Sequence, residues 1–212
     1  MRLWLIVPVK PFTLGKSRLA PMFSLEERTA LARSLLLQTL KTVAAVEDLG
    51  GIIAISRDES VLMLARQCGA STLVERSMTV ETTVETLADP EARLNHALRQ
   101  ARAVAADRGA DAVLVLPADL PLLTAHDIEA LIALGAQQDR CVVLAGSSDG
   151  GTNALLVRPP HAIDFAYGPQ SLQRHRALAE MAGLTVYEME SAALALDLDS
   201  PEDWVNWQAQ VG

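Results

Sequence analysis

The sequence predicts a single α/β domain over residues 1–212, with helices on both faces of a mostly parallel, mixed sheet. Short apolar runs alternate with longer segments of helical period, which is the pattern of repeated β-α-β units. Half of the 212 residues are apolar and only 4% are aromatic. A core of Ala, Leu and Val between helices and a sheet fits that composition, and the length is that of one ordinary domain.

Apolar runs and helix caps predict the elements of the amino-terminal half. The run from residue 3 to residue 9 is uninterrupted, as in a strand buried on both faces, and Pro11 and Gly15 indicate a loop after it. Ser24 and Glu27 form the capping-box pattern that begins a helix. Together these signals predict strands at 3–9, 52–56 and 70–74 and helices at 24–42, 58–67 and 89–107.

The carboxy-terminal half continues the alternation. Thr124 resembles another helix start, and Ser200 with Pro201 begins a final helix. Trp204 and Trp207 lie three residues apart on one face of that helix, which favours a packing role. The signals predict strands at 112–116, 141–145, 153–157 and 185–188 and helices at 124–134, 171–182 and from 200 onward.

Charge and cysteine usage exclude several classes of function. The formal net charge is −8 and there is no local run of Lys and Arg, so polynucleotide binding is not expected. Cys68 and Cys141 lack CxxC spacing, which indicates buried, reduced thiols rather than a disulfide or a zinc site. No apolar stretch approaches the roughly 20 residues of a membrane helix, and the amino terminus does not resemble a signal peptide. We therefore expect a cytoplasmic protein that does not bind membranes.

A parallel sheet binds its ligand beyond the carboxyl ends of its strands, so the loops that follow the strands should carry the chemistry. The first such loop holds Lys10, Lys16 and Arg18 around Gly15. A flexible cationic loop can surround a triphosphate with backbone N–H groups and neutralise its charge. The spacing is not that of a Walker A loop, and a solvated basic loop is the alternative interpretation.

Aspartates near the ends of later strands predict a metal site. Asp119 is held between Pro117 and Pro121 after the fourth strand. Mg²⁺ prefers one or two carboxylates together with phosphate oxygens, as phosphoryl transfer requires. Asp197 and Asp199 lie two residues apart, hence on one face of extended backbone, and would form the second half of the site. The alternatives are an Asx turn at Asp119 and a turn before the last helix at Asp199.

Two loops rich in small hydrogen-bond donors indicate a second anion site. The hydroxyls of Thr152 and Ser171 and the backbone of Gly168 can receive a phosphate or a carboxylate, and Ser171 begins a helix whose N-terminus favours anions. His175 lies one turn further on; ordinary loops are the alternative. The four histidines, each expected on a surface or a helix face, show no H-x-x-x-H spacing. G-x-S-x-G and G-x-G-x-x-G are absent, which disfavours hydrolase and NAD chemistry.

In combination these segments resemble the CofC/FbiD family, the guanylyltransferases of deazaflavin coenzyme F-420 biosynthesis. The resemblance runs in order over nearly the whole chain. The segments that carry it are VPVK at 7–10, GKSRL at 15–19, LNHAL at 94–98, PADLP at 117–121, GGTNAL at 150–155, YGP at 167–169 with Ser171 and His175, and LDLD at 196–199.

The resemblance implies a Rossmann-like nucleotidyltransferase fold and a Mg²⁺-dependent transfer of GMP from GTP to 2-phospho-L-lactate, phosphoenolpyruvate or a similar phospho-acid, with release of pyrophosphate. It also leaves open a homodimer. The implied catalytic residues are Lys16, Arg18 and Asp119. By similarity, the triphosphate is bound by Lys10, Lys16 and Arg18, the guanine by Leu94 and Asn95, Mg²⁺ by Asp119, Asp197 and Asp199, and the phospho-acid by Thr152, Gly168 and Ser171, assisted by His175.

Two departures from the family pattern concern the substrates. Residues 77–88, with Met78, Glu81 and Glu85, form a longer stretch than expected before Leu94, which bears on base selection. Leu172 stands where an aromatic residue is expected, next to the phospho-acid loop. The competing hypotheses are a nucleotidyltransferase for a molybdopterin or sugar phosphate, whose A-G-G-x-S-x-R loop is absent here, and a catalytically silent nucleotide sensor.

Overall fold

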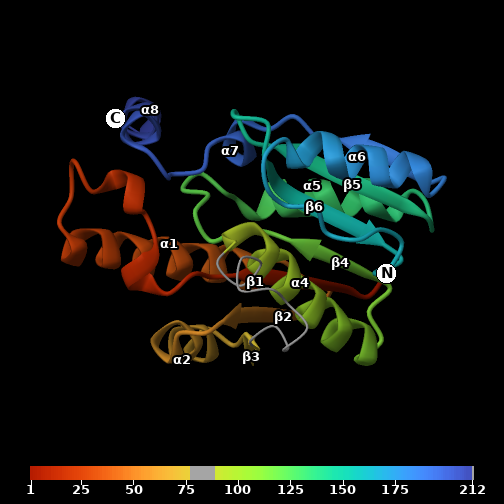
Figure 1. Ribbon diagram of the computed structural model, residues 1–212. Helices are drawn as coiled ribbons and strands as arrows, with labels where there is room; N and C mark the ends of the chain where they lie inside the picture. Colours follow the sequence, from red (N-terminus) through yellow and green to blue (C-terminus); the bar gives the residue numbers. More distant parts are fainter. Residues whose placement is uncertain (77–88, 212) are drawn as a thin grey trace.

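The computed structural model describes residues 1–76 and 89–211, and these residues form a seven-stranded mixed sheet between two layers of helices (Figure 1). The order across the sheet is β3-β2-β1-β4-β6-β5-β7. The 77–88 segment, which departs from the family pattern, lies outside the described residues. The strands are β1 (Leu3–Pro8), β2 (Leu49–Ser56), β3 (Ser71–Val74), β4 (Ala112–Val115), β5 (Cys141–Gly146), β6 (Thr152–Arg158) and β7 (Thr185–Glu188).

The strand directions bring the functional loops to one edge of the sheet. β1 pairs in parallel with β2 and β4, β2 with β3, and β5 with β7, whereas β6 is antiparallel to both β4 and β5. The predicted mixed, mostly parallel sheet is therefore confirmed. The carboxyl ends of the parallel strands and the amino end of β6 lie along the same edge.

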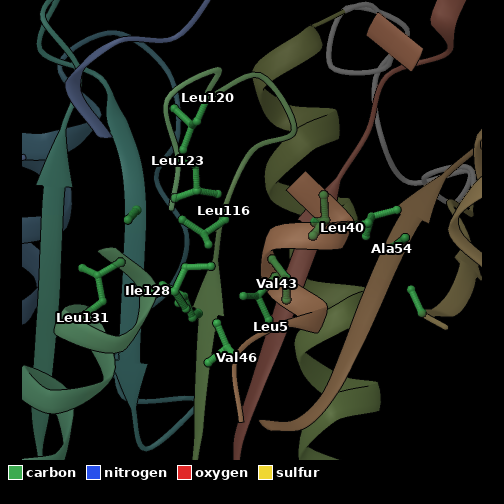
Figure 2. Packing of buried hydrophobic residues seen from close by; sticks show 14 of the residues in the cluster. Leu5, Leu40, Val43, Val46, Ala54, Leu116, Leu120, Leu123, Ile128 and Leu131 are labelled. Atoms are coloured by element: carbon green, nitrogen blue, oxygen red, sulfur yellow. The ribbon is translucent and has the colours of Figure 1, made fainter. Parts of the chain in front are cut away.

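Two apolar cores, one on each face, hold the helices to the sheet. Helices α1, α2, α5 and α7 cover one face, and α4 and α6 cover the other. Leu5 and Ile6, neighbours in β1, belong to opposite cores, as the two-residue period of a strand buried on both faces requires. Figure 2 shows Leu40 and Val43 of α1 on the same face as Leu5. The α-helices are α1 (Leu25–Ala44), α2 (Glu59–Gln67), α4 (Pro90–Asp107), α5 (Ala125–Ala136), α6 (Ser171–Met181), α7 (Ala192–Ala195) and α8 (Pro201–Val211).

The predicted helix caps are present. Ser24 Oγ accepts from the Glu27 backbone N–H at 3.2 Å, and the Glu27 carboxylate accepts from the Ser24 N–H at 2.8 Å. Reciprocal capping of this kind typically stabilises a helix by about 1 kcal/mol. Thr124 caps α5 in the same way. None of the helices within the described ranges is long and apolar enough to cross a bilayer.

The carboxy-terminal helix α8 lies near the segment that leads into α1, as Figure 1 shows. The ring centroids of Trp204 and Phe23 are 4.7 Å apart, and those of Trp204 and Trp207 are 5.0 Å apart. The predicted packing role of these tryptophans is thus confirmed. The prediction for the cysteines is only partly right, because Cys141 is buried but Cys68 is half-buried at the end of α2.

Candidate active site

Polar residues line the sheet edge in an order set by the strands. Because β3, β2, β1 and β4 are neighbours in the sheet and parallel, the loops after them lie side by side. β6 contributes its first residue to the same edge because it runs the other way. Along the edge from β3 to β6 the residues are Glu75, Arg57, Lys10, Asp119 and Thr152.

A cavity of about 490 Å³ lies along this edge, a volume in the usual range for a small-molecule site. Lys10 and Lys16 line it together with Asp119. Leu94 also lines it, so its predicted place beside the ligand is compatible with the structure. Farther along, Arg57, Glu75 and Arg93 contribute charged groups to the lining.

Lys16 links the beginning of the chain to its middle and its end. It lies between two short 3-10 turns, η1 (Phe12–Leu14) and η2 (Ser17–Leu19), and its side chain is only 7% exposed. Lys16 Nζ is 2.8 Å from Asp119 Oδ2 and 3.8 Å from Asp199 Oδ1. Arg18 Nη1 is 3.5 Å from Asp199 Oδ2, but its side chain is 72% exposed and lines neither cavity of the site. Lys16 therefore lies close to both Asp119 and Asp199, whereas Arg18 reaches Asp199 from outside the cavities.

The three predicted metal ligands differ in their surroundings. Burial raises the pKa of Asp197, and the charge of Asp119 raises it further, so these two carboxylates interact. The Leu198 N–H donates to the Asp119 carbonyl at 3.0 Å and ties the two segments together. Asp199 pairs with Lys16, as Asp119 does, and also with Arg18. Within residues 1–76 and 89–211, no three acidic, histidine or cysteine side chains form a complete metal cluster.

The three aspartates of the predicted Mg²⁺ site line the adjoining cavities: Asp119 and Asp199 line the larger one and Asp197 the smaller one. Mg²⁺ binds through one or two protein carboxylates and completes its shell with phosphate oxygens and water. The charge of Asp119 disfavours ionisation of Asp197, and a bound cation would relieve this repulsion. Asp119 and Asp199 both pair with Lys16, so the ion pairs do not separate them as candidate ligands.

A second cavity, of about 260 Å³, adjoins the first. Lys10, Pro90 and Leu94 line both cavities, so Lys10 lies at their junction. The second cavity contains the predicted phospho-acid residues Thr152, Gly168 and Ser171. Carboxylates that also line it are Glu91, Asp149 and Asp197.

Thr152, Ser171 and His175 form a buried hydrogen-bonded chain. Thr152 Oγ1 is 3.0 Å from Ser171 Oγ and 3.1 Å from His175 Nδ1. The Ala166 backbone N–H donates to His175 Nε2 at 2.9 Å, so neutral His175 carries its proton on Nδ1 and donates to Thr152. One of the two hydroxyls donates its hydrogen to the other in their shared hydrogen bond. The hydrogen of the second hydroxyl is then left to donate into the cavity. The pair is thereby arranged to receive an anionic oxygen.

His175 lies on a face of α6, one of the two expected positions, but that face is buried and lines neither cavity. Its assistance to the acceptor stays a prediction. His175 is fully buried beneath Thr152, with its ring against that of Tyr167 at a centroid distance of 4.8 Å. Burial, with a contribution from the charge of Arg174, lowers the pKa of His175 to about 4. His175 is therefore a neutral residue that positions the hydroxyls.

Replacing His175 by Gln should flatten the acid side of the stability profile. The unfolded imidazole titrates near 6.5 and the folded one near 4, so the unfolded chain binds the proton first as the pH falls through this window. The wild-type protein should lose about 3 kcal/mol of unfolding free energy between these values through His175 alone. Denaturant unfolding of both proteins at about pH 7 and about pH 4 measures this difference, because other titrating groups are common to both. Parallel profiles would show that His175 is not buried and neutral.

Gly168 and Asn95 shape the loop that precedes α6. Gly168 has φ +134°, a backbone conformation that side-chain-bearing residues rarely adopt, so this position favours glycine. The Asn95 amide donates to the Tyr167 carbonyl at 3.0 Å and accepts from the Tyr167 N–H at 2.9 Å. The Asn95 amide thus holds this loop and lines neither cavity, and its contact with the base stays a prediction. Leu172 packs against Gly146 and is likewise absent from the lining, so its departure leaves the cavity wall unchanged.

Sequence reasoning missed several charged residues of the two cavities. Arg57 and Glu75 follow β2 and β3 directly, so the rule that functional residues follow parallel strands would have found them. Arg93 and Glu91 lie in the first turns of α4, and their orientation toward the cavities depends on how that helix packs.

The sheet and its two helix layers form the fold of the nucleotide-diphospho-sugar transferases. A protein assigned as a nucleotide-diphospho-sugar transferase from Desulfovibrio desulfuricans G20 has a similar structure, with a TM-score of 0.73 over 100% of this chain and 89% of that one. The sequence identity is 16%, so this likeness shows the fold alone.

The chain belongs to the family described as "Guanylyl transferase CofC like", whose profile matches residues 3–207. A phosphoenolpyruvate guanylyltransferase from Sphaerobacter thermophilus is 39% identical over 93% of this chain and 88% of its own length. A 3-phospho-D-glycerate guanylyltransferase from Phenylobacterium zucineum is 37% identical over 90% of this chain and 83% of its own. The family resemblance carried by the sequence motifs is therefore confirmed.

Proposed function

We propose that this protein transfers GMP from GTP to a small phospho-acid with release of pyrophosphate, in the biosynthesis of deazaflavin coenzyme F-420. The observation that carries this proposal is the junction of the two cavities at Lys10. The larger cavity has cationic residues for a triphosphate, and the smaller one has the hydroxyl pair for an anion. The acceptors named for two relatives are both small phospho-acids.

The reaction needs little from the protein beyond positioning and charge neutralisation. An oxygen of the acceptor phosphate attacks the α-phosphorus of GTP, the bond from that phosphorus to the bridging oxygen breaks, and pyrophosphate leaves. The attacking phosphate is already ionised, so no general base is required. Lys10 at the cavity junction and Lys16 beside it can hold the triphosphate and stabilise the developing charge.

Mg²⁺ is part of this proposal. Asp119 lines the larger cavity and Asp197 the smaller one, so a cation held by the pair would serve both substrates. When bound, it would neutralise phosphate charge in the transition state. The carboxylates that line the smaller cavity would otherwise repel an anionic acceptor.

We expect the protein to act on free nucleotides in the cytoplasm, since its net charge of −8 opposes binding to nucleic acid. A homodimer stays a prediction from the family resemblance.

A pyrophosphate-release assay tests the proposed function. The purified protein is incubated with Mg²⁺, each of the four nucleoside triphosphates, and phosphoenolpyruvate, 2-phospho-L-lactate or 3-phospho-D-glycerate in turn. We expect release with GTP and at least one of these acceptors. GTP binding without release for any acceptor would instead identify a nucleotide sensor, and release with another nucleotide would identify a different nucleotidyltransferase.

A further inference from the structure

Glu75 places a carboxylate in the larger cavity, after β3, whereas the lysines follow β1, two strands away in the sheet. It follows β3, its backbone N–H donates to the Ser56 carbonyl at 2.9 Å, and its side chain is only 19% exposed. Burial raises the pKa of Glu75 above its usual range. An acid in a cavity that accepts a triphosphate is unfavourable unless it faces another part of the ligand.

The strand order places Glu75 away from the triphosphate. β3 and β4 are separated by β2 and β1, which is three strand spacings or roughly 14 Å. Glu75 follows β3 and Asp119 follows β4, with Lys10 and Lys16 after β1 in between. A nucleotide whose phosphates were bound by the lysines would have room in the same cavity to extend its base toward Glu75.

Two arginines accompany Glu75 at this end of the cavity. Arg93 Nη2 is 3.4 Å from Glu75 Oε1, and the charge of Arg57 also acts on the Glu75 carboxylate. Both arginines line the cavity beside Glu75. The 3.4 Å contact is long for a charged hydrogen bond. The carboxylate is therefore held near the arginine but keeps oxygen lone pairs that can accept from other donors.

We infer that Glu75 selects guanine, by accepting hydrogen bonds from its N1–H and its N2 amino group while Arg57 or Arg93 donates to O6. This inference rests on the proposed function. A carboxylate only accepts and a guanidinium only donates, so the site demands an edge with one acceptor followed by two donors. Guanine has this pattern. Adenine presents a donor and then an acceptor, cytosine a donor and two acceptors, and uracil a donor between two acceptors.

Equilibrium binding of three nucleotides to the wild-type protein and to Glu75→Gln tests the inference. GTP, inosine triphosphate, which lacks the N2 amino group, and ATP are titrated in the presence of Mg²⁺. The wild-type protein should bind GTP roughly 10- to 100-fold more tightly than inosine triphosphate, because one charge-assisted hydrogen bond is lost. In Glu75→Gln, GTP affinity should fall by a similar factor and approach that of inosine triphosphate, whereas ATP affinity should not fall.

Matched variants separate this role from a structural one. Glu59→Gln removes a different arginine-paired acid, at the start of α2 and outside both cavities, and should leave all three affinities unchanged. At least one of Arg57→Gln and Arg93→Gln should weaken the binding of GTP and of inosine triphosphate together, since both nucleotides carry O6. Thermal unfolding of each variant shows whether it is folded.

The outcomes also separate this inference from the proposed function. One outcome is that the wild-type protein prefers GTP and folded Glu75→Gln keeps the full preference for GTP over inosine triphosphate. In that case Glu75 does not select the base, and the proposed guanylyl transfer still stands. If the wild-type protein binds the nucleotides equally well, both the inference and guanine selection fail.

Discussion

Replacing Asp119 by Asn should lower the turnover number by at least about 10²-fold while the protein keeps its fold. The Asp119 carboxylate accepts from Lys16 Nζ at 2.8 Å, and Asn retains its shape but not its charge. The backbone bond from the Leu198 N–H to the Asp119 carbonyl is independent of the side chain, and the side chain is 29% exposed. The variant should therefore unfold near the wild-type temperature. Pyrophosphate release at saturating GTP and acceptor gives the turnover number.

An exposed acid elsewhere provides the control for Asp119. Asp139 pairs with Arg158 away from both cavities, and Asp139→Asn should turn over like the wild-type protein. Titration of Mg²⁺ adds a second measurement, since a protein that has lost a metal ligand should require a higher concentration. Near-normal turnover of Asp119→Asn with an unchanged Mg²⁺ requirement would refute the metal-binding role.

Replacing Lys16 by Met should lower kcat/KM for GTP by roughly 10²- to 10³-fold, the usual cost of removing one partner of a buried charge pair at a binding site. Met is similar in length and removes only the ammonium group. Asp119 and Asp199 would then face the triphosphate without the cation that lies 2.8 Å and 3.8 Å from them. Both carboxylates are partly exposed to water, so the fold should persist.

The effect of Lys16→Met should be specific to the nucleotide. Lys16 lines the larger cavity and not the smaller one, so KM for the acceptor should change much less than KM for GTP. Lys41→Met, in the exposed last turn of α1, is the matched control and should behave like the wild-type protein. An increase confined to the acceptor KM would place Lys16 at the other substrate.

The features that could be predicted from the sequence depend on short-range patterns. The helix cap depends only on Ser24 and Glu27, which are three residues apart. The burial of β1 on both faces is indicated by a single apolar run. The meeting of Lys16 with Asp119 followed from a general rule, because both segments come after parallel strands. Local signals and one topological rule were sufficient for this part of the site.

The features that could not be predicted depend on contacts between distant segments. Asn95 bonds to Tyr167, 72 residues away, and His175 bonds to Thr152, 23 residues away. No local pattern indicates either partner, so the sequence alone does not show that these side chains hold neighbouring segments in place. The apolar run that forms β6 likewise gives no sign of its antiparallel direction, which is what brings Thr152 to the sheet edge.

The most direct test of convergence at Lys10 is a crystal structure of the protein with Mg²⁺, a phospho-acid and a GTP analogue whose α,β-bridging oxygen is a methylene group. We expect the triphosphate in the larger cavity, the acceptor phosphate on the Thr152 and Ser171 hydroxyls, and the α-phosphorus beside Lys10. A nucleotide bound away from Lys10 and Asp119, or an acceptor bound outside the smaller cavity, would contradict the proposal that the two substrates meet at Lys10.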